Sequence, residues 1–318
     1  MDENRTRVAV IGGGRNCEHE VSLASAAAAA NALNPARYDV VRLTIDRQGS
    51  WHGPDGRPIG LPAAVDMLAG CDVALPLLHG PRGEDGTLAA LLDLVDIPYV
   101  GSGVRAGALA MDKWATKLVA EAIGIATAPG VLLTASTAPA YTWSGPVVVK
   151  PIAAGSSHGV SLVRRPDELA ASLEAALALD DRVLVEQQIV GREIDIAVVA
   201  RPEGARVLSP ALEISVDGFF DFAAKYDGSA GFQIPAMMGE GERKGLEDAA
   251  LRMFDALGCG GVARIDFFLT ADGLVLNEVN TAPGFTEHSQ VPRMFAAAGM
   301  TYAELLDMLI GDALAARP

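Results

Sequence analysis

The segment from Val262 to Asn280 constrains the fold most strongly, because its pattern is typical of an antiparallel hairpin. At its centre, Ala271-Asp272-Gly273 fits a three-residue turn with glycine at the left-handed position. In the register that this turn sets, Thr270 faces Leu274, and side chains two residues apart point to the same side of the sheet. One face of the hairpin then carries four polar side chains: Arg264, Asp266, Glu278 and Asn280.

Asp266 and Glu278 face each other in this register, and two facing carboxylates repel unless a cation lies between them. Hard oxygen ligands without histidine or cysteine favour Mg²⁺, which also bridges phosphate groups. We therefore expect Asp266, Glu278 and Asn280 to bind the metal, and Arg264 to stabilise negative charge that develops beside it. The alternative is a solvated strand face with scattered charges, which agrees less well with the apolar residues that alternate with these four.

Upstream of the hairpin, short apolar segments alternate with helical segments, which predicts an N-terminal parallel α/β domain over residues 1–101. Its expected helix covers residues 21–33, and its expected strands cover 8–11, 40–45, 73–77 and 98–100. A second, α+β domain is expected over residues 102–190, and a third over 191–318. Their expected helices cover 111–123, 166–179, 242–257 and 302–314, and the strands of the second domain cover 147–150, 160–163 and 183–186.

Two loops and one flexible segment have the composition of binding elements. The loop from Lys150 to Gly159 is rich in glycine and serine, and its amides and lysine suit phosphates, although an ordinary hairpin turn explains it equally well. The segment after Gly12-Gly13-Gly14 lacks the glycine that a dinucleotide fingerprint needs at position 17. Glu20, near the start of the following helix, suits an ammonium group or the helix dipole. Residues 217–231 are rich in Gly, Asp and Ser, as lids often are.

Composition excludes several classes of partner. The net charge of −15 repels phosphate backbones and anionic lipids, so we expect no nucleic acid and no membrane among the partners. Three widely spaced cysteines, Cys17, Cys71 and Cys259, form no disulfide or zinc pattern. The apolar tract at 24–30 is too short to span a bilayer, and the N-terminus lacks a signal-peptide core, so we expect a cytoplasmic protein.

Several motifs together resemble the D-alanine–D-alanine ligases of the ATP-grasp superfamily, in order and over nearly the whole chain. They are EHEVSLAS at 18–25, LHGPRGEDGT at 78–87, YVGSGVRAGALAMDK at 99–113, VKPIAAGSSHGVS at 149–161, AKY at 224–226, and RIDFF followed by NEVNTAPGFTEHS up to 289. The resemblance implies a three-domain ATP-grasp fold in which the N-terminal domain is Rossmann-like and two α+β domains clamp ATP. It further implies ligation of two D-alanine molecules, through an acyl phosphate, for peptidoglycan precursor synthesis.

The resemblance also implies a set of site residues. The catalytic group would be Glu20, bonded to Ser156 and Tyr226, together with Arg264 and the amide of Gly284. His79 would lie near the first substrate, and Ser289 and Gln290 near the second. ATP would contact Lys113, Lys150, Glu186, Glu193 and Lys225, with two Mg²⁺ ions, replaceable by Mn²⁺, on Asp266, Glu278 and Asn280. The family suggests that the small-molecule substrates are D-amino acids and ATP, and that the protein is a homodimer.

Two positions depart from the family pattern, His158 in the glycine–serine loop and Gln290 where leucine is usual. Gln290 leaves open a different second substrate, such as D-serine, or no change at all if its amide bonds to the protein. An idle ATP-grasp binding protein is opposed by the intact set of Arg264, Asp266, Glu278 and Asn280. A dehydrogenase is opposed by Cys17, which breaks the dinucleotide fingerprint.

Overall fold

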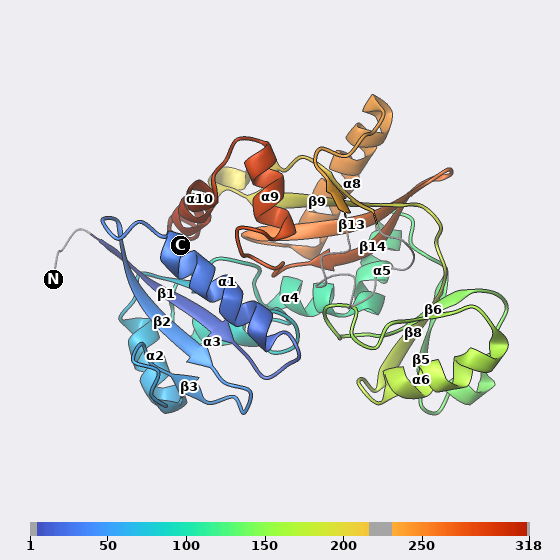
Figure 1. Cartoon of the computed structure of the whole chain (residues 1–318), viewed down its shortest axis with the longest axis horizontal. Helices are drawn as coiled ribbons and strands as arrows, with labels where there is room; N and C mark the ends of the chain where they lie inside the picture. The colour runs from blue at the N-terminus through green and yellow to red at the C-terminus, as the bar shows by residue number, and fades with distance from the viewer. Residues whose placement is uncertain (1–4, 216–230, 317–318) are drawn as a thin grey trace.

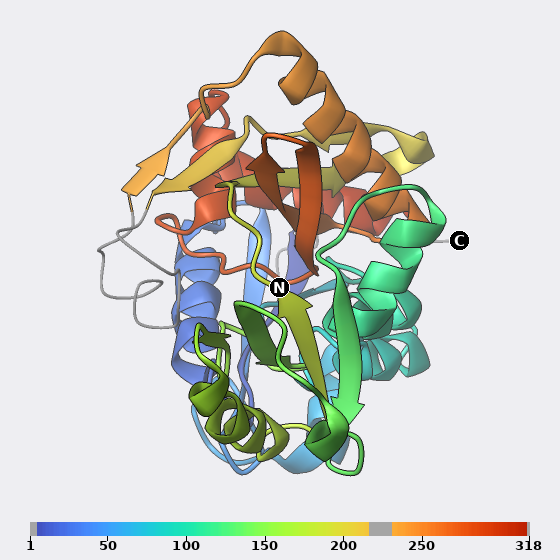
Figure 2. The ribbon, with the colours of Figure 1, turned by 90° about the vertical axis from the view of Figure 1, so that its right-hand side faces the viewer.

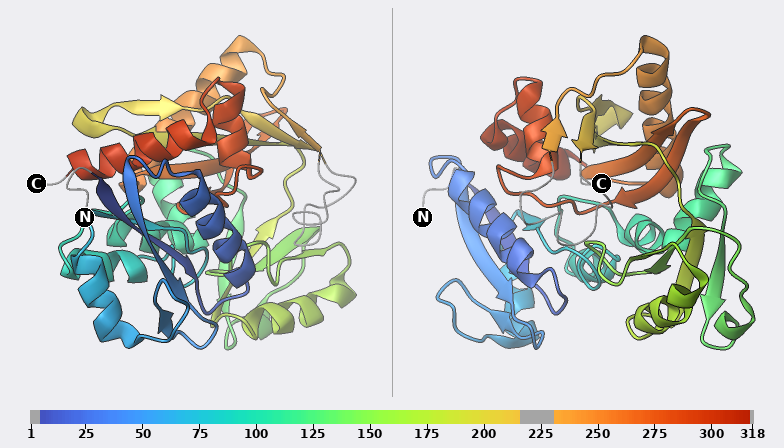
Figure 3. Two further views of the ribbon diagram at one scale, coloured as in Figure 1. Left: turned by 60° about the vertical axis from the view of Figure 1, so that its left-hand side comes forward. Right: turned by 45° about the vertical axis from the view of Figure 1, so that its right-hand side comes forward.

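Three β-sheets organise the chain, and a computed structural model describes residues 5–215 and 231–316 of it (Figure 1). Residues 217–230 of the expected lid, with Lys225 and Tyr226, lie outside the described residues. In one view the N-terminal sheet and the central sheet lie on opposite sides beneath the C-terminal sheet (Figure 3). The ATP-grasp architecture expected from the family is confirmed by this α/β arrangement.

The N-terminal sheet has the order β3-β2-β1-β4, with β1 parallel to both β2 and β4. Its elements are β1 (Thr6–Gly13), α1 (His19–Ala32), β2 (Tyr38–Ile45), β3 (Trp51–His52), α2 (Gly60–Ala69), β4 (Val73–Pro76) and α3 (Thr87–Leu94). Alternate side chains of β1 pack in different hydrophobic cores. Val8 and Val10 pack with α1, whereas Ala9 and Ile11 pack with α2 and α3. Both faces are therefore covered, as a parallel sheet requires. The expected strand at 98–100 is reduced to a single bridge between Ala74 and Tyr99.

The central sheet is antiparallel and has the order β5-β8-β6-β7. Its elements are β5 (Gly130–Thr134), β6 (Val147–Pro151), β7 (Ser161–Val163), α6 (Leu169–Leu177) and β8 (Arg182–Gln187), with short 3₁₀ turns at Ala138–Ala140 and Pro166–Glu168. Alternating valines from β6 and β8 meet Leu169 and Leu173 of α6 in one core. The glycine–serine loop therefore joins β6 to β7 at the edge of this sheet, below the C-terminal sheet in Figure 2.

The C-terminal sheet has the order β12-β11-β9-β13-β14, and β10 pairs with β9. Its strands are β9 (Arg192–Ala200), β10 (Arg206–Leu208), β11 (Leu212–Ser215), β12 (Gly231–Gln233), β13 (Val262–Thr270) and β14 (Gly273–Asn280), with a 3₁₀ turn at Pro202–Gly204. One face packs on α8 (Glu240–Leu257), and the other shares a core with α9 (Gln290–Ala297), α10 (Tyr302–Ala315) and the N-terminal sheet. No single helix in the described part of the chain is long and apolar enough to cross a membrane; α9 and α10 meet that criterion only as a pair bent by 104°.

The helix expected at 111–123 is α5 (Lys113–Ala122), and a helix that the sequence did not predict, α4 (Val104–Met111), precedes it across Asp112. The Asp112 carboxylate accepts a hydrogen bond from the amide of Ala115 at 2.9 Å, so it caps α5 and ends the run of α4. Both helices pack against the C-terminal sheet in the core that contains Ile196 and Phe254. The division at 1–101, 102–190 and 191–318 stays a prediction, and these two helices precede the central sheet without joining its core.

The β13–β14 hairpin has the predicted register at its functional end and a different one at its turn. Asp266 pairs with Glu278, and Arg264 pairs with Asn280, as the sequence predicts. Thr270, however, pairs with Gly273 instead of Leu274, because only Ala271 and Asp272 form the turn. A bulge next to Asp266 absorbs the extra residue and restores the register. The residues between the four polar ones, including Ile265 and Phe267, are buried in the core beneath. Arg264 and Asp266 are buried as well, so the solvated-face alternative is wrong.

We expect Asp112→Ala to lower the free energy of unfolding by about 0.5–2 kcal/mol, because α5 loses its N-cap. Asp112→Asn keeps a capping oxygen and loses only the ion pair with Arg182, whose Nη2 lies 2.8 Å from the Asp112 carboxylate. Urea denaturation of both variants measures the difference. Equal destabilisation by alanine and asparagine would show that the ion pair, not the cap, stabilises this junction.

Candidate active site

A cavity of about 520 Å³ lies where the three sheets approach one another. Its lining includes the start of α1, the glycine–serine loop, the polar face of the β13–β14 hairpin and the segment that leads into α9. The predicted residues that line it are Glu20, His79, Lys113, Ser156, Glu193, Arg264, Asp266, Glu278, Asn280, Gly284, Ser289 and Gln290. Lys150 and Glu186 are not among the lining residues.

Three carboxylates and one guanidinium form the floor of this cavity. Asp195 on β9 pairs in register with Asp266 on β13, and Asp266 pairs with Glu278 on β14, so the acids form a row across three strands. Arg264 donates from Nε to Asp266 Oδ1 at 2.7 Å and from Nη2 to Asp266 Oδ2 at 2.6 Å. Its Nε also lies 3.4 Å from Asp195 Oδ2. Burial opposes the charge on Arg264, but these carboxylates raise its pKa overall, so it stays a cation.

Gln290 completes the floor from the first residue of α9. Arg264 Nη1 donates to Gln290 Oε1, and Gln290 Nε2 donates to Asp195 Oδ2 at 3.2 Å. The sequence identified Gln290 as a residue of the second-substrate pocket, and its side chain does line the cavity. Its amide is bonded to protein on both sides, so a substrate hydroxyl is not needed to satisfy it. Asp195 was not predicted; its place opposite Asp266 depends on the pairing of β9 with β13.

The expected metal ligands fit a hard cation. Asp266 and Glu278 carry only oxygen ligands, and Asn280 Oδ1 is buried without a hydrogen-bond partner within the described residues. The described ranges contain no cluster of three or more His, Cys, Asp or Glu side chains arranged for a metal, and the expected set has only two such residues. A carbonyl oxygen left without a donor next to two carboxylates is the arrangement that a cation would satisfy.

The bond expected between Glu20 and Ser156 is wrong, because Ser156 Oγ donates to Glu18 Oε1 instead. Glu20 is 72% exposed and accepts from Arg47 Nη2 at 2.8 Å. Glu18 is buried, and its Oε2 has no hydrogen-bond partner within the described residues. The phase of α1 explains the difference, because Glu18 precedes Ser22 by four residues and lies on the buried face of the helix. That periodicity was readable in the sequence and identifies Glu18.

Two glycines allow the chain to approach the Glu18 carboxylate. Gly155, in the loop between β6 and β7, lies so close that a Cβ atom would overlap Glu18 Oε2. A Cβ atom at Gly80, in the loop after β4, would lie 2.5 Å from the same oxygen, and Gly80 has a φ of +68°, which disfavours other residues. Glu18 therefore sits where the N-terminal and central parts of the chain meet, and any side chain at either glycine would push the carboxylate out of place.

The expected ATP residues divide into two groups. Lys113 Nζ donates to the carbonyl of Ala154 at 2.9 Å, which fastens the glycine–serine loop. Away from the main cavity, Glu186 forms ion pairs with Lys150 and with Lys117, the latter at 3.1 Å. Burial alone would raise the pKa of Glu186, but Lys150 and Lys117 hold it below its usual value. Lys117 was not predicted, since an isolated lysine on a helix gives no sequence signal.

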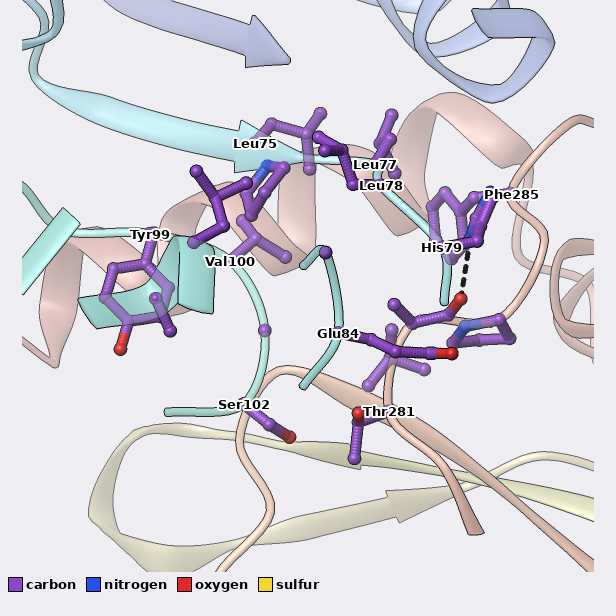
Figure 4. Close-up of a pocket in the computed structure, with 18 of the residues that line it drawn as sticks. Leu75, Leu77, Leu78, His79, Glu84, Tyr99, Val100, Ser102, Thr281 and Phe285 are labelled. Carbon is purple, nitrogen blue, oxygen red and sulfur yellow. Dashed lines mark hydrogen bonds between the residues drawn. The ribbon is translucent and has the colours of Figure 1, made fainter. Parts of the chain in front are cut away.

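His79 joins the N-terminal domain to the loop that follows β14. Its Nδ1 donates to the carbonyl of Ala282 at 2.7 Å (Figure 4), and its Nε2 accepts from Ser25 Oγ at 3.1 Å. Burial lowers the pKa of His79, so the ring is neutral and this tautomer is the one that the two partners require. The loop that follows β14 continues to Ser289, just before α9. Ser289 Oγ accepts a hydrogen bond from the amide of Thr286 at 3.0 Å.

Glu84 lies between the main cavity and a smaller one of about 60 Å³ lined by Leu75, Tyr99 and Phe285 (Figure 4). Its Oε1 accepts from the amide of Gly80 at 2.9 Å, whereas Oε2 has no hydrogen-bond partner in the described ranges. Burial, reinforced by the negative charge of Glu18, raises the pKa of Glu84 to about 8. The Glu84 carboxyl group is therefore neutral at pH 7, although the sequence assigns Glu84 no role beyond its place in the motif at 78–87.

The raised pKa makes folding depend on pH. Between the ordinary value of 4.5 and about 8, the folded chain keeps the Glu84 proton that the unfolded chain has lost, so stability falls as pH rises through this range. We expect Glu84→Gln, which keeps the bond to Gly80, to remove this component. Thermal unfolding of both proteins from pH 5 to pH 8 measures it. If the two melting temperatures differ by the same amount at every pH, Glu84 does not titrate in this way.

Comparison with known proteins agrees with this geometry. The family model described as D-ala D-ala ligase C-terminus matches residues 126–311, and that described as D-ala D-ala ligase N-terminus matches 7–63 and 58–102.

A D-alanine–D-alanine ligase of Mycolicibacterium smegmatis is 41% identical over 98% of this chain and 96% of its own length. The solved VanG D-Ala:D-Ser ligase of Enterococcus faecalis is 32% identical, with a TM-score of 0.82 over 97% of this chain and 99% of that one. The D-alanine–D-alanine ligase of Bacillus anthracis, solved with ATP, is 28% identical, with a TM-score of 0.81 over 98% of both chains. The chain therefore belongs to the D-alanine–D-alanine ligase family of ATP-dependent enzymes.

Proposed function

We propose that this enzyme uses ATP to join two D-alanine molecules into D-alanyl-D-alanine, for peptidoglycan precursor synthesis in the cytoplasm. The observation that carries the proposal is the row of facing carboxylates with Arg264 on the floor of the cavity. The relatives named above act on D-alanine and, in one case, were solved with ATP. A homodimer, with no nucleic acid or membrane partner, agrees with the family resemblance and the acidic composition.

The first D-alanine binds with its ammonium group at Glu18 in this proposal. Glu18 offers a buried carboxylate with one oxygen held by Ser156 and the other without a partner in the described residues. An ammonium group supplies the donor that this oxygen lacks, and a charge-assisted hydrogen bond is strong in a buried site. Glu18 therefore takes the role that the sequence had suggested for Glu20. The neutral ring of His79 contributes position instead of charge.

The carboxylate of the first substrate then attacks the γ-phosphorus of ATP, which forms an acyl phosphate and releases ADP. Asp266, Glu278 and Asn280 would hold Mg²⁺, expected as two ions that Mn²⁺ could replace, and the metal would supply positive charge to offset that of the phosphates. Lys113 and Lys150 contact the phosphates, while Glu186 and Glu193 contact the adenosine. Lys150 must leave its pairing with Glu186 for this role, so nucleotide binding exchanges partners at that pair. The expected roles of Lys225 and Tyr226 stay predictions, because both residues lie outside the described residues.

The second D-alanine attacks the acyl carbon with its neutral amine, and the tetrahedral intermediate expels phosphate. Arg264 and the amide of Gly284 stabilise the oxyanion. Ser289 lies directly before α9, where the amides at the helix N-terminus favour the acceptor carboxylate. The alternative acceptor is D-serine or another amino acid, since the VanG relative is a D-Ala:D-Ser ligase of similar fold. Phosphate release measured over D- and L-amino acids, with ATP in excess, tests the function and the choice of acceptor together.

We expect Glu278→Gln to lower ligation about a hundredfold or more at low millimolar Mg²⁺, since one of the facing charges that holds the metal is lost. The fold should persist, because the amide has the same shape. ADP release coupled to D-alanine consumption measures activity, and circular dichroism controls for folding. Turnover close to that of the unaltered enzyme would refute the metal assignment.

Glu18→Gln is expected to raise the KM for the first D-alanine by about tenfold or more, because a neutral amide replaces the ammonium partner. Glu20→Gln is the matched control, two residues away on the exposed side of the same helix, and should change this KM by less than about twofold. Steady-state kinetics at saturating ATP give both values. A larger effect at Glu20 than at Glu18 would return the ammonium site to Glu20.

A further inference from the structure

On the floor of the cavity, the buried guanidinium of Arg264 lies among three carboxylates, which are either buried or line the cavity. Asp195 and Asp266 are almost inaccessible to solvent, and Glu278 lines the cavity beside them. Arg264 holds both oxygens of Asp266 and lies 3.4 Å from Asp195. In the proposed function, however, Asp266 also binds the metal, which competes with Arg264 for its oxygens. A second anchor for Arg264 is then required to keep it next to the reacting carbon.

Gln290 and Asp195 have the geometry of such an anchor. The guanidinium can only donate, so the Gln290 atom that faces Arg264 is the carbonyl oxygen. A carboxylate can only accept, so the atom that faces Asp195 is the amide nitrogen, at 3.2 Å. The amide therefore has a single orientation that satisfies both neighbours. Gln290 is the first residue of α9, a helix packed into the core through Val291, Met294 and Phe295, so its backbone is held rigidly.

We propose that Gln290 and Asp195 form a positioning pair that holds Arg264 over the reacting centre when Asp266 exchanges the guanidinium for the metal. The proposal rests on the proposed function. Asp195 supplies the counter-charge, and Gln290 bridges it to Nη1, on the far side of the guanidinium from the Asp266 contacts. Leucine in place of Gln290 would provide neither bond. The glutamine is thus a positioning residue that acts through Arg264, in contrast to a pocket wall that selects the acceptor side chain.

Kinetics of Gln290→Leu test this assignment. We expect kcat for D-alanine to fall about tenfold, with the KM for ATP and for the first D-alanine within about twofold, because Arg264 loses a charge-assisted bond. The ratio of kcat/KM for D-serine and D-alanine as acceptors should stay constant. In an Arg264→Lys background, Gln290→Leu should have no further effect, since a residue acting through Arg264 is not additive with it. A changed acceptor ratio with an unchanged kcat for D-alanine would overturn the proposal and make Gln290 a specificity residue.

A second measurement does not depend on turnover. With ¹⁵N-labelled arginine, the Nε–H resonance of Arg264, assigned by its loss in Arg264→Lys, should stay slowly exchanging when Mg²⁺ and a non-hydrolysable ATP analogue are added. In Gln290→Leu and in Asp195→Asn, the same addition should accelerate its exchange. Arg192 is the internal control, because it has a similar two-bond pair with Glu213, at 2.8 and 2.6 Å, outside the cavity. Equal protection of Arg264 in all variants would refute the anchor, whereas absence of D-alanine-dependent ADP release in the unaltered enzyme would refute the proposed function instead.

Discussion

The balance of charge around Arg264 is the constraint on which the rest of the site depends. The pairing of β9, β13 and β14 places Asp195, Asp266 and Glu278 in one row, and burial makes so many negative charges costly unless cations meet them. Arg264 supplies one positive charge from within the same sheet. In the proposed function, a divalent cation would meet these carboxylates from the cavity side.

The three sheets are positioned by contacts that converge on the same cavity. His79 ties the N-terminal domain to the segment after β14, and Glu18 ties α1 to the glycine–serine loop of the central sheet. Each contact joins elements that are far apart in sequence, and each uses a buried polar side chain. The bonds that join these distant segments therefore also fix the orientation of Glu18 and His79 at the cavity.

Buried acids in this site have different roles because their surroundings differ. Glu84 forms no ion pair with a cation among the described residues and lies near another acid, Glu18, so its pKa is raised to about 8. Glu186 is equally buried but lies between two lysines, and it stays ionised. Neither outcome follows from the residue type. The raised pKa of Glu84 makes folding sensitive to pH, whereas Glu186 forms buried ion pairs with Lys150 and Lys117.

The sequence by itself determined which residues share a face, because alternation along a strand is a local property. It placed Asp266 opposite Glu278 and Arg264 opposite Asn280, although the turn it assumed was one residue too long and a bulge made up the difference. Together with the family motifs, this was enough for the fold and the class of reaction. Only the tertiary structure decided which partner each polar group meets. Ser156 bonds to Glu18 and not to Glu20, Lys150 pairs with Glu186, and Gln290 joins Arg264 to Asp195. These choices depend on contacts between distant segments, which local periodicity cannot encode because it records only which way a side chain points.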